Sequence, residues 1–282
     1  MRTKAYFNGE IGNYDEMVIP MSDRSVFYGD AVYDAVLVLN KKPFTLGLHL
    51  DRLYRSCELA DIHFTMPRET LLAEIDRLLA VSEGDSLMLY LQVTRGAAPR
   101  KHEYPADAAP NLIMFIAPTK LPPRDKRASL LSIEDLRFAY CHIKTTNLMP
   151  NVFASEKATK AGATEALLHR GMRVTEGAHS SILMIKDGEV VMPPLDEYVL
   201  PGITRRVIDD VCRTLGIPVS HRVFSIDELM GADEIILCST TKNVVFVYEI
   251  DGVAVGGKDP SLAKKVQTAF LEEVYKDTGV RL

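Results

Sequence analysis

The sequence predicts an α+β fold in which strands of mixed direction are accompanied by segregated helices. Strand-like and helix-like segments do not alternate regularly along the 282 residues, as they would in a doubly wound sheet. The glycine patterns GxGxxG and GxxxxGK[ST] are absent, so neither a dinucleotide-binding fold nor a P-loop is indicated. Three prolines among charged residues interrupt the chain at 118–126. We therefore predict an N-terminal domain at 1–117, a linker at 118–126 and a C-terminal domain at 127–282.

Turn residues and hydrophobic periodicity define the elements of the first half. Asn8-Gly9 is a typical hairpin turn between two short strands. Strands are expected at 31–40 and 86–94, where β-branched and other apolar residues are concentrated. Apolar residues recur at helical spacing over 50–57 and 71–79, which predicts two amphipathic helices.

The second half has the same mixture of elements. Its turns are marked by Asp187-Gly188 and Asp251-Gly252. The expected elements are a helix at about 151–161, a strand at 164–168, a hairpin at 182–192, a helix from about Thr204, strands within 234–255 and a final helix.

Composition excludes several classes of function. A net charge of −5 lacks the basic excess of a nucleic-acid-binding protein. No apolar run approaches the roughly 20 residues of a membrane span, and the N-terminus becomes polar too early for a signal peptide. The four cysteines form no CxxC pair, so neither a zinc site nor a disulfide framework is indicated. We expect a soluble, cytoplasmic protein without a metal, nucleic-acid or membrane partner.

Lys144 and Glu176 are the first two candidate functional residues. Lys144 is flanked by apolar residues and is predicted at a strand end, although many such lysines simply extend to solvent. Its amine can form a Schiff base with an aldehyde when burial lowers the pKa of that amine. Glu176 follows in a segment of small residues and can be a surface carboxylate, or an anion that keeps a pyridine nitrogen protonated.

A candidate phosphate site comes after these two residues. Gly202-Ile203-Thr204 precedes a predicted helix, whose free N–H groups can bind a phosphate dianion. Thr204 could also be an ordinary helix cap. Ser239-Thr240-Thr241 follows an apolar strand and offers hydroxyl groups to the same phosphate. A lysine, an acidic residue and a phosphate turn, in this order, are what a pyridoxal-phosphate enzyme must supply.

These segments resemble the class IV (fold type IV) pyridoxal-phosphate aminotransferases. Further matching segments are found at 23–24, 29–34, 49–53 and 92–96, so that the resemblance runs in order from about Ala5 to Val247. The family includes D-amino-acid aminotransferases, branched-chain aminotransferases and aminodeoxychorismate lyases. The resemblance implies a small N-terminal α/β domain, a larger C-terminal domain with a barrel-like sheet, and the cofactor between them. It also implies a homodimer with active sites near the subunit interface.

The same resemblance assigns roles to individual residues. It implies a Schiff base between the cofactor and Lys144, with Glu176 facing the pyridine nitrogen. The residues implied to contact the cofactor phosphate are Arg52, Ile203, Thr204 and Thr240.

Arg100-Lys101-His102 decides the expected substrate. It resembles the signature of D-amino-acid aminotransferases, in which this loop comes from the neighbouring subunit and, with the tyrosine matching Tyr33, binds the substrate α-carboxylate. The planar guanidinium of Arg100 suits a carboxylate, although a solvated basic loop is the alternative. We expect transamination between a D-amino acid, such as D-alanine or D-glutamate, and a 2-oxo acid, 2-oxoglutarate or pyruvate. A branched-chain L-amino-acid aminotransferase and an aminodeoxychorismate lyase-like enzyme are the alternative functions.

Two departures from the family pattern affect the expected substrate range. Ile182 stands where the family typically has Asn, and Lys242-Asn243 replaces a small residue followed by Glu. Neither departure involves a residue assigned to covalent chemistry, so transamination is still expected.

Overall fold

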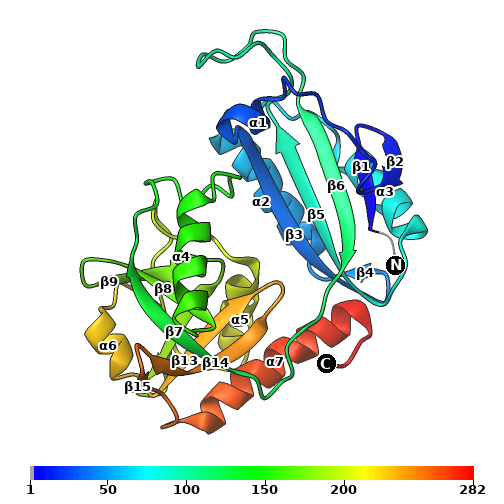
Figure 1. The fold of residues 1–282 in the computed structure, drawn as a ribbon. Helices are drawn as coiled ribbons and strands as arrows, with labels where there is room; N and C mark the ends of the chain where they lie inside the picture. The colour runs from blue at the N-terminus through cyan, green and yellow to red at the C-terminus, as the bar shows by residue number, and fades with distance from the viewer. Residues whose placement is uncertain (1–2) are drawn as a thin grey trace. The chain divides into compact units, whose positions relative to one another are not determined.

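The computed structural model describes residues 3–282, which fold into two compact units (Figure 1). Unit 1 contains the described residues up to Lys120 together with Ile143–Asn147 and Asp277–Val280. Unit 2 contains Leu121–His142, Leu148–Lys276 and Arg281–Leu282. Lys144 is therefore grouped with unit 1, although it lies within the second half of the sequence. The domain boundaries at 117 and 127 stay a prediction.

Unit 1 is built on a six-stranded sheet in the order β2-β1-β6-β5-β3-β4, and all of its neighbouring strands are antiparallel. The predicted hairpin turn at Asn8-Gly9 is confirmed, because both residues have positive φ and join β1 to β2. The strands are β1 (Lys4–Phe7), β2 (Glu10–Asn13), β3 (Ala31–Leu39), β4 (Lys42–Pro43), β5 (Ser86–Thr94) and β6 (Asn111–Pro118).

The two faces of this sheet differ. The helices α2 (Leu46–Leu59) and α3 (Arg68–Val81) pack their buried leucines and isoleucines on one face, which confirms the predicted helical periodicity. Side chains alternate between the two faces along each strand, so the residues between those of the core point to the other face. That face carries a row of stacked aromatic rings. Tyr33 stacks on Tyr90 at 5.4 Å between ring centroids, and Tyr90 stacks on Phe115 at 4.7 Å. A short helix, α1 (Arg24–Tyr28), precedes β3.

Unit 2 contains a nine-stranded sheet in the order β12-β11-β10-β13-β14-β7-β8-β9, with β15 paired to β14. The sheet is mixed, since β11/β12, β14/β7 and β7/β8 are parallel and the remaining pairs are antiparallel. Because β9, at one end of the order, contacts β10 in its middle, the sheet curls, as a barrel-like sheet requires. The strands are β7 (Arg127–Glu134), β8 (Glu165–Arg170), β9 (Arg173–Gly177), β10 (Ser181–Lys186), β11 (Glu189–Met192), β12 (Val219–His221), β13 (Glu234–Ser239), β14 (Asn243–Ile250) and β15 (Val253–Ala254).

Unit 2 also contains helices between and after these strands. They are α4 (Met149–Lys160), α5 (Ile203–Thr214), α6 (Ile226–Met230) and α7 (Pro260–Thr278), the last of which ends in residues of unit 1. α4 contacts β7 and β8, and α5 contacts β12 and β13. The predicted turns at Asp187-Gly188 and Asp251-Gly252 are confirmed, since all four residues have positive φ. None of the helices in residues 3–282 has the length and apolar character to cross a membrane.

Candidate active site

Lys144 lies in an irregular segment that runs beside β3. The Tyr33 N–H donates to the Lys144 carbonyl at 2.9 Å, and the Lys144 N–H donates to the Ser56 hydroxyl at 3.3 Å. Only an isolated bridge between Val32 and Thr145 has strand geometry, so the prediction that Lys144 lies at a strand end is wrong. Apolar neighbours occur both in a strand and in a loop that is hydrogen-bonded to a neighbouring strand. The sequence pattern therefore does not distinguish these two structures.

The Lys144 side chain lies on the aromatic face of the sheet of unit 1. Its Nζ is 4.3 Å from the centroid of the Tyr33 ring, within the range of a cation–π contact. The predicted catalytic lysine and a predicted substrate residue are therefore neighbours.

Arg52 is fixed by a buried carboxylate from the adjacent strand. The Arg52 Nε and Nη2 donate to the two oxygens of Asp34 at 2.9 and 2.8 Å, and His49 Nδ1 lies 2.7 Å from Asp34 Oδ1. Burial alone would raise the pKa of Asp34, but Arg52 and His49 together hold that pKa well below its usual range. A bidentate pair of this kind fixes the plane of the guanidinium that is expected to contact the cofactor phosphate.

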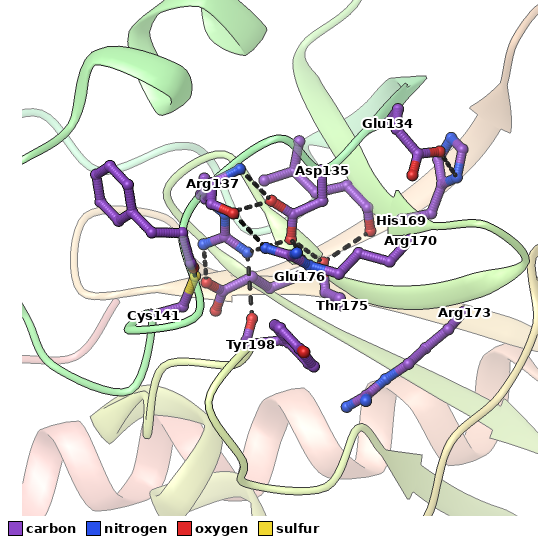
Figure 2. Close-up of polar contacts among 12 residues, drawn as sticks. Glu134, Asp135, Arg137, Cys141, His169, Arg170, Arg173, Thr175, Glu176 and Tyr198 are labelled. Atoms are coloured by element: carbon purple, nitrogen blue, oxygen red, sulfur yellow. Dashed lines mark hydrogen bonds and ion pairs between the residues drawn. The ribbon is translucent and has the colours of Figure 1, made fainter.

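Glu176 is the penultimate residue of β9 in unit 2 and is buried. Figure 2 shows its polar contacts. Its Oε1 accepts a hydrogen bond from Arg137 Nη1, and its Oε2 accepts one from the Leu200 N–H at 3.1 Å. Burial raises the pKa of Glu176, and the Arg137 guanidinium opposes that shift. Arg137 is held in turn by Asp135, through Nε at 2.9 Å and Nη2 at 2.8 Å.

Arg137 is a residue that the sequence reasoning missed. It lies between β7 and α4, in a stretch without a recognisable motif, and it reaches Glu176 across 39 positions of sequence. The only available signal was a pair of oppositely charged residues, Asp135 and Arg137, near the start of the predicted C-terminal domain.

The N-terminus of α5 fits a phosphate group. The helix begins at Ile203, and its N-cap is Gly202, which provides no side-chain cap, so Thr204 is not the helix cap. The first N–H groups of a helix lack intrahelical partners and bind anions readily. The turn packs closely on β10, because a Cβ on Gly202 would lie 2.7 Å from the Ser181 hydroxyl oxygen.

Unit 2 brings its predicted cofactor residues together. Leu200, which donates to Glu176, is two residues before Gly202, so Glu176 is linked directly to the start of α5. Ser181, against Gly202, pairs with Cys238 across β10 and β13. Cys238 is followed by the turn that contains Thr240. Ser181 therefore lies against the N-terminus of α5 and beside the end of the strand that leads into the Thr240 turn.

Arg100 and His102 lie in the long loop between β5 and β6, which extends beyond the ends of these strands (Figure 1). The Arg100 guanidinium carbon is 5.3 Å from the centroid of the Tyr28 ring, and the His102 ring is 5.4 Å from it. Arg24 anchors this loop by donating to the Lys101 carbonyl at 2.6 Å. In the described part of this chain, Arg100 and His102 thus gather at Tyr28, whereas Tyr33 lies with Tyr90 and Lys144.

The departures from the family pattern have structural explanations. Ile182 is fully buried in the core beneath β10. Asn243 has a φ of 55°, a left-handed conformation that Asn tolerates better than Glu. Lys242 is ion-paired with the buried Glu165. Throughout residues 3–282 no group of three or more His, Cys, Asp or Glu side chains could hold a metal ion.

A family model for amino-transferase class IV matches residues 31–250 of the chain. The chain belongs to the class IV aminotransferase family. It is 34% identical over 279 residues to the D-alanine aminotransferase of Bacillus licheniformis, covering 98% of this chain and 99% of that protein. It is 36% identical over 282 residues to the D-alanine aminotransferase of Listeria innocua, with 98% of both chains covered.

Solved structures of class IV enzymes share the fold. The Escherichia coli branched-chain amino acid aminotransferase superposes with a TM-score of 0.88 at 21% identity, covering 100% of this chain and 97% of that one. A second branched-chain amino acid aminotransferase, complexed with N-(5'-phosphopyridoxyl)-L-glutamate, gives a TM-score of 0.86 at 22% identity, with 100% and 96% covered. Class IV aminotransferases depend on pyridoxal phosphate, and the open helix N-terminus and the buried Glu176 of unit 2 fit that cofactor.

Replacing Asp34 by Asn should destabilise the fold. The amide cannot neutralise Arg52, and removing one partner of a buried ion pair costs about 3–5 kcal/mol. Because the pKa of Asp34 is lowered on folding, its contribution is complete above the unfolded pKa of about 3.9 and is lost as the pH falls below it. Urea unfolding should therefore show a difference between wild type and variant that is constant from pH 7 to about 5 and shrinks at lower pH.

Asp51→Asn is the matched control, because Asp51 of α2 forms an exposed ion pair with Arg68 of α3 in the same unit. That change should cost less than about 1 kcal/mol. Equal effects of the two substitutions at pH 7 would contradict the assigned role of Asp34.

Proposed function

We propose that this protein transfers the amino group of a D-amino acid, such as D-alanine or D-glutamate, to a 2-oxo acid such as 2-oxoglutarate or pyruvate. The observation that carries the proposal is similarity over nearly the whole chain to proteins named D-alanine aminotransferase. The Arg100-Lys101-His102 sequence supports the same substrate class. Branched-chain aminotransferases share the fold at 21–22% identity, which says nothing of substrate.

Pyridoxal phosphate, when bound, supplies a cationic ring that accepts the charge left after removal of a substrate Cα proton. In our proposal Lys144 Nζ would hold the cofactor covalently and would act as the general base that accepts the substrate Cα proton. Glu176 keeps the pyridine nitrogen protonated. Arg137 supports this role, because it favours the ionised form of a carboxyl group that burial would otherwise neutralise.

The remaining residues bind and orient. The N–H groups of Ile203 and Thr204, the Thr240 hydroxyl and the Arg52 guanidinium bind the cofactor phosphate in this proposal. Tyr33, Arg100 and His102 bind the substrate α-carboxylate, with the fork of the Arg100 guanidinium as the main anchor.

Lys144 should be the only lysine that holds the cofactor covalently. Purified protein should be yellow, and borohydride reduction followed by peptide mapping should find the cofactor on the peptide that contains Lys144. The Lys144→Ala variant should bind cofactor without a borohydride-stable link and lose activity. Lys160→Ala, at an exposed lysine with no assigned role, provides the control for lysine removal in general, and a label on any lysine other than Lys144 would exclude the assignment.

D-Amino acids should be the productive donors, and Arg100 should be their carboxylate anchor. Arg100→Ala should lower kcat/KM for D-alanine about ten- to a hundredfold, because a charge-assisted bidentate contact contributes roughly 1.5–3 kcal/mol. The affinity for the cofactor should change little. The measurement is steady-state transamination of D-alanine, D-glutamate, L-leucine and L-glutamate with 2-oxoglutarate. Faster turnover of either L-amino acid would favour the branched-chain alternative.

We further propose that the protein works in the cytoplasm as a homodimer. Each unit exposes large apolar side chains, which a second copy of the chain would cover. Val18 and Met21 are 81% and 77% exposed in unit 1. Leu136, Met149 and Phe153 are 77%, 68% and 60% exposed in unit 2. The position of Arg100 and His102 at Tyr28, rather than at Tyr33, supports a loop that serves the partner's active site.

Mixed dimers can test this arrangement. Neither Lys144→Ala nor Arg100→Ala alone should be fully active, but in mixed dimers one site combines the intact Lys144 of one chain with the intact Arg100 of the other. Random association should restore roughly a quarter of wild-type activity in a symmetric dimer. Lys144→Ala mixed with a chain that carries both changes is the control. Light scattering that shows a monomer, or mixing without restoration, would contradict the proposal.

A further inference from the structure

Glu165 is a buried carboxylate that none of the assigned roles uses. It is the first residue of β8 and is 2% exposed. Its Oε1 accepts from the His179 N–H at 2.9 Å and lies 2.7 Å from His179 Nδ1. Its Oε2 accepts from the Ser180 hydroxyl at 2.9 Å and from Lys242 Nζ. Burial alone would raise the pKa of Glu165, but His179 and Lys242 together lower it to about 2, so the group is charged at neutral pH.

The first segment that Glu165 holds is the loop between β9 and β10. This loop starts after Gly177, the residue that follows Glu176, and leads into Ser181, which lies against Gly202. It lies directly on the carboxylate, because a Cβ on Gly177 would be 2.5 Å from Glu165 Oε1. The Gly177 N–H donates to the Ser180 carbonyl at 2.7 Å, which closes the loop.

The second segment is the turn between β13 and β14. The Lys242 N–H donates to the Ser239 carbonyl at 3.2 Å and to the Ser239 hydroxyl at 3.3 Å, so Lys242 closes the turn that contains Thr240. Asn243 follows in a left-handed conformation and pairs back with Ser239. The side chain of Lys242, 20% exposed, reaches from this turn to Glu165. Its ammonium group is therefore already neutralised by a carboxylate.

We propose that Glu165 and Lys242 are a positioning pair for the cofactor phosphate. The buried carboxylate is a common anchor for the loop that packs on the N-terminus of α5 and for the turn that presents Thr240. Because both segments are attached to the same carboxylate, the hydrogen-bond donors at the start of α5 and in the Thr240 turn keep fixed positions relative to each other. A preorganised site for a single phosphate requires such fixed positions. This inference rests on the proposed cofactor. Lys242 acts through the turn and does not itself contact the phosphate.

The experiment compares pyridoxal phosphate with pyridoxal, which lacks the phosphate, as ligands of the apoprotein. Absorbance titration should give an affinity for pyridoxal phosphate that is about 10- to 100-fold lower in Lys242→Met and in Glu165→Gln, from loss of a charge-assisted contact. The affinity of each variant for pyridoxal should stay within about twofold of the wild-type value. Pyridoxal has no phosphate, so it does not use the donors that the Glu165–Lys242 pair positions. The double variant should bind no more weakly than the single variants, since the tether is already broken in each.

Lys242→Arg keeps the ion pair and should retain most of the preference for the phosphate, which keeps the proposal testable if Glu165→Gln fails to fold. Glu156→Gln with Lys160→Met removes an exposed ion pair of the same unit and is the matched control. Equal losses for both ligands would indicate a general structural role and overturn the proposal. Tighter binding of pyridoxal phosphate by Glu165→Gln would show that Lys242 is instead a counter-ion of the phosphate, and would also overturn it. If wild type fails to bind pyridoxal phosphate, the proposed function fails first.

Discussion

Charge burial is the constraint that organises both units. A carboxylate removed from water must be paired, because the cost of leaving it unpaired amounts to several kcal/mol. Asp34 is paired with Arg52, Asp135 with Arg137, and Glu165 with Lys242. The first pair fixes Arg52, which is itself assigned to the site. The other two pairs fix Arg137 and Lys242, which hold Glu176 and the Thr240 turn. The polar site residues thus owe their orientation to carboxylates that lie behind them.

These pairs serve position more than stability. A buried ion pair is often matched or exceeded in stability by well-packed apolar residues of similar volume. An apolar replacement for Asp34 would nevertheless leave the guanidinium of Arg52 without a fixed plane. The same argument applies to Asp135, since it binds the Nε and Nη2 atoms of the Arg137 guanidinium whose Nη1 donates to Glu176. Such pairs therefore suit a site in which the orientation of the guanidinium groups matters.

The sequence predicts local structure well and long-range pairing poorly. The helical spacing of Leu50 and Leu53 and the turn residues at Asn8-Gly9 are local signals, and the structure agrees with both. Arg137 and Glu165 were missed, because Glu176 and Lys242, with which they pair, lie 39 and 77 positions away in the sequence. The identity of a charged residue does not indicate which distant residue it pairs with. The family motif supplied Lys144, Glu176 and Thr240 as single residues. It did not supply the carboxylates that hold the surrounding segments.

Lys144 is the exception to this pattern, and the difference suits its proposed role. Its backbone is fixed by Tyr33 and Ser56, whereas its Nζ lies against the Tyr33 ring. A cation–π contact contributes about 0.5–2 kcal/mol, less than the 3–5 kcal/mol lost when a buried ion pair such as that of Arg52 is broken. An amine that must bond to a cofactor, leave it and then move a proton cannot be held by a contact as strong as an ion pair. An aromatic face orients the amine while leaving it free to react.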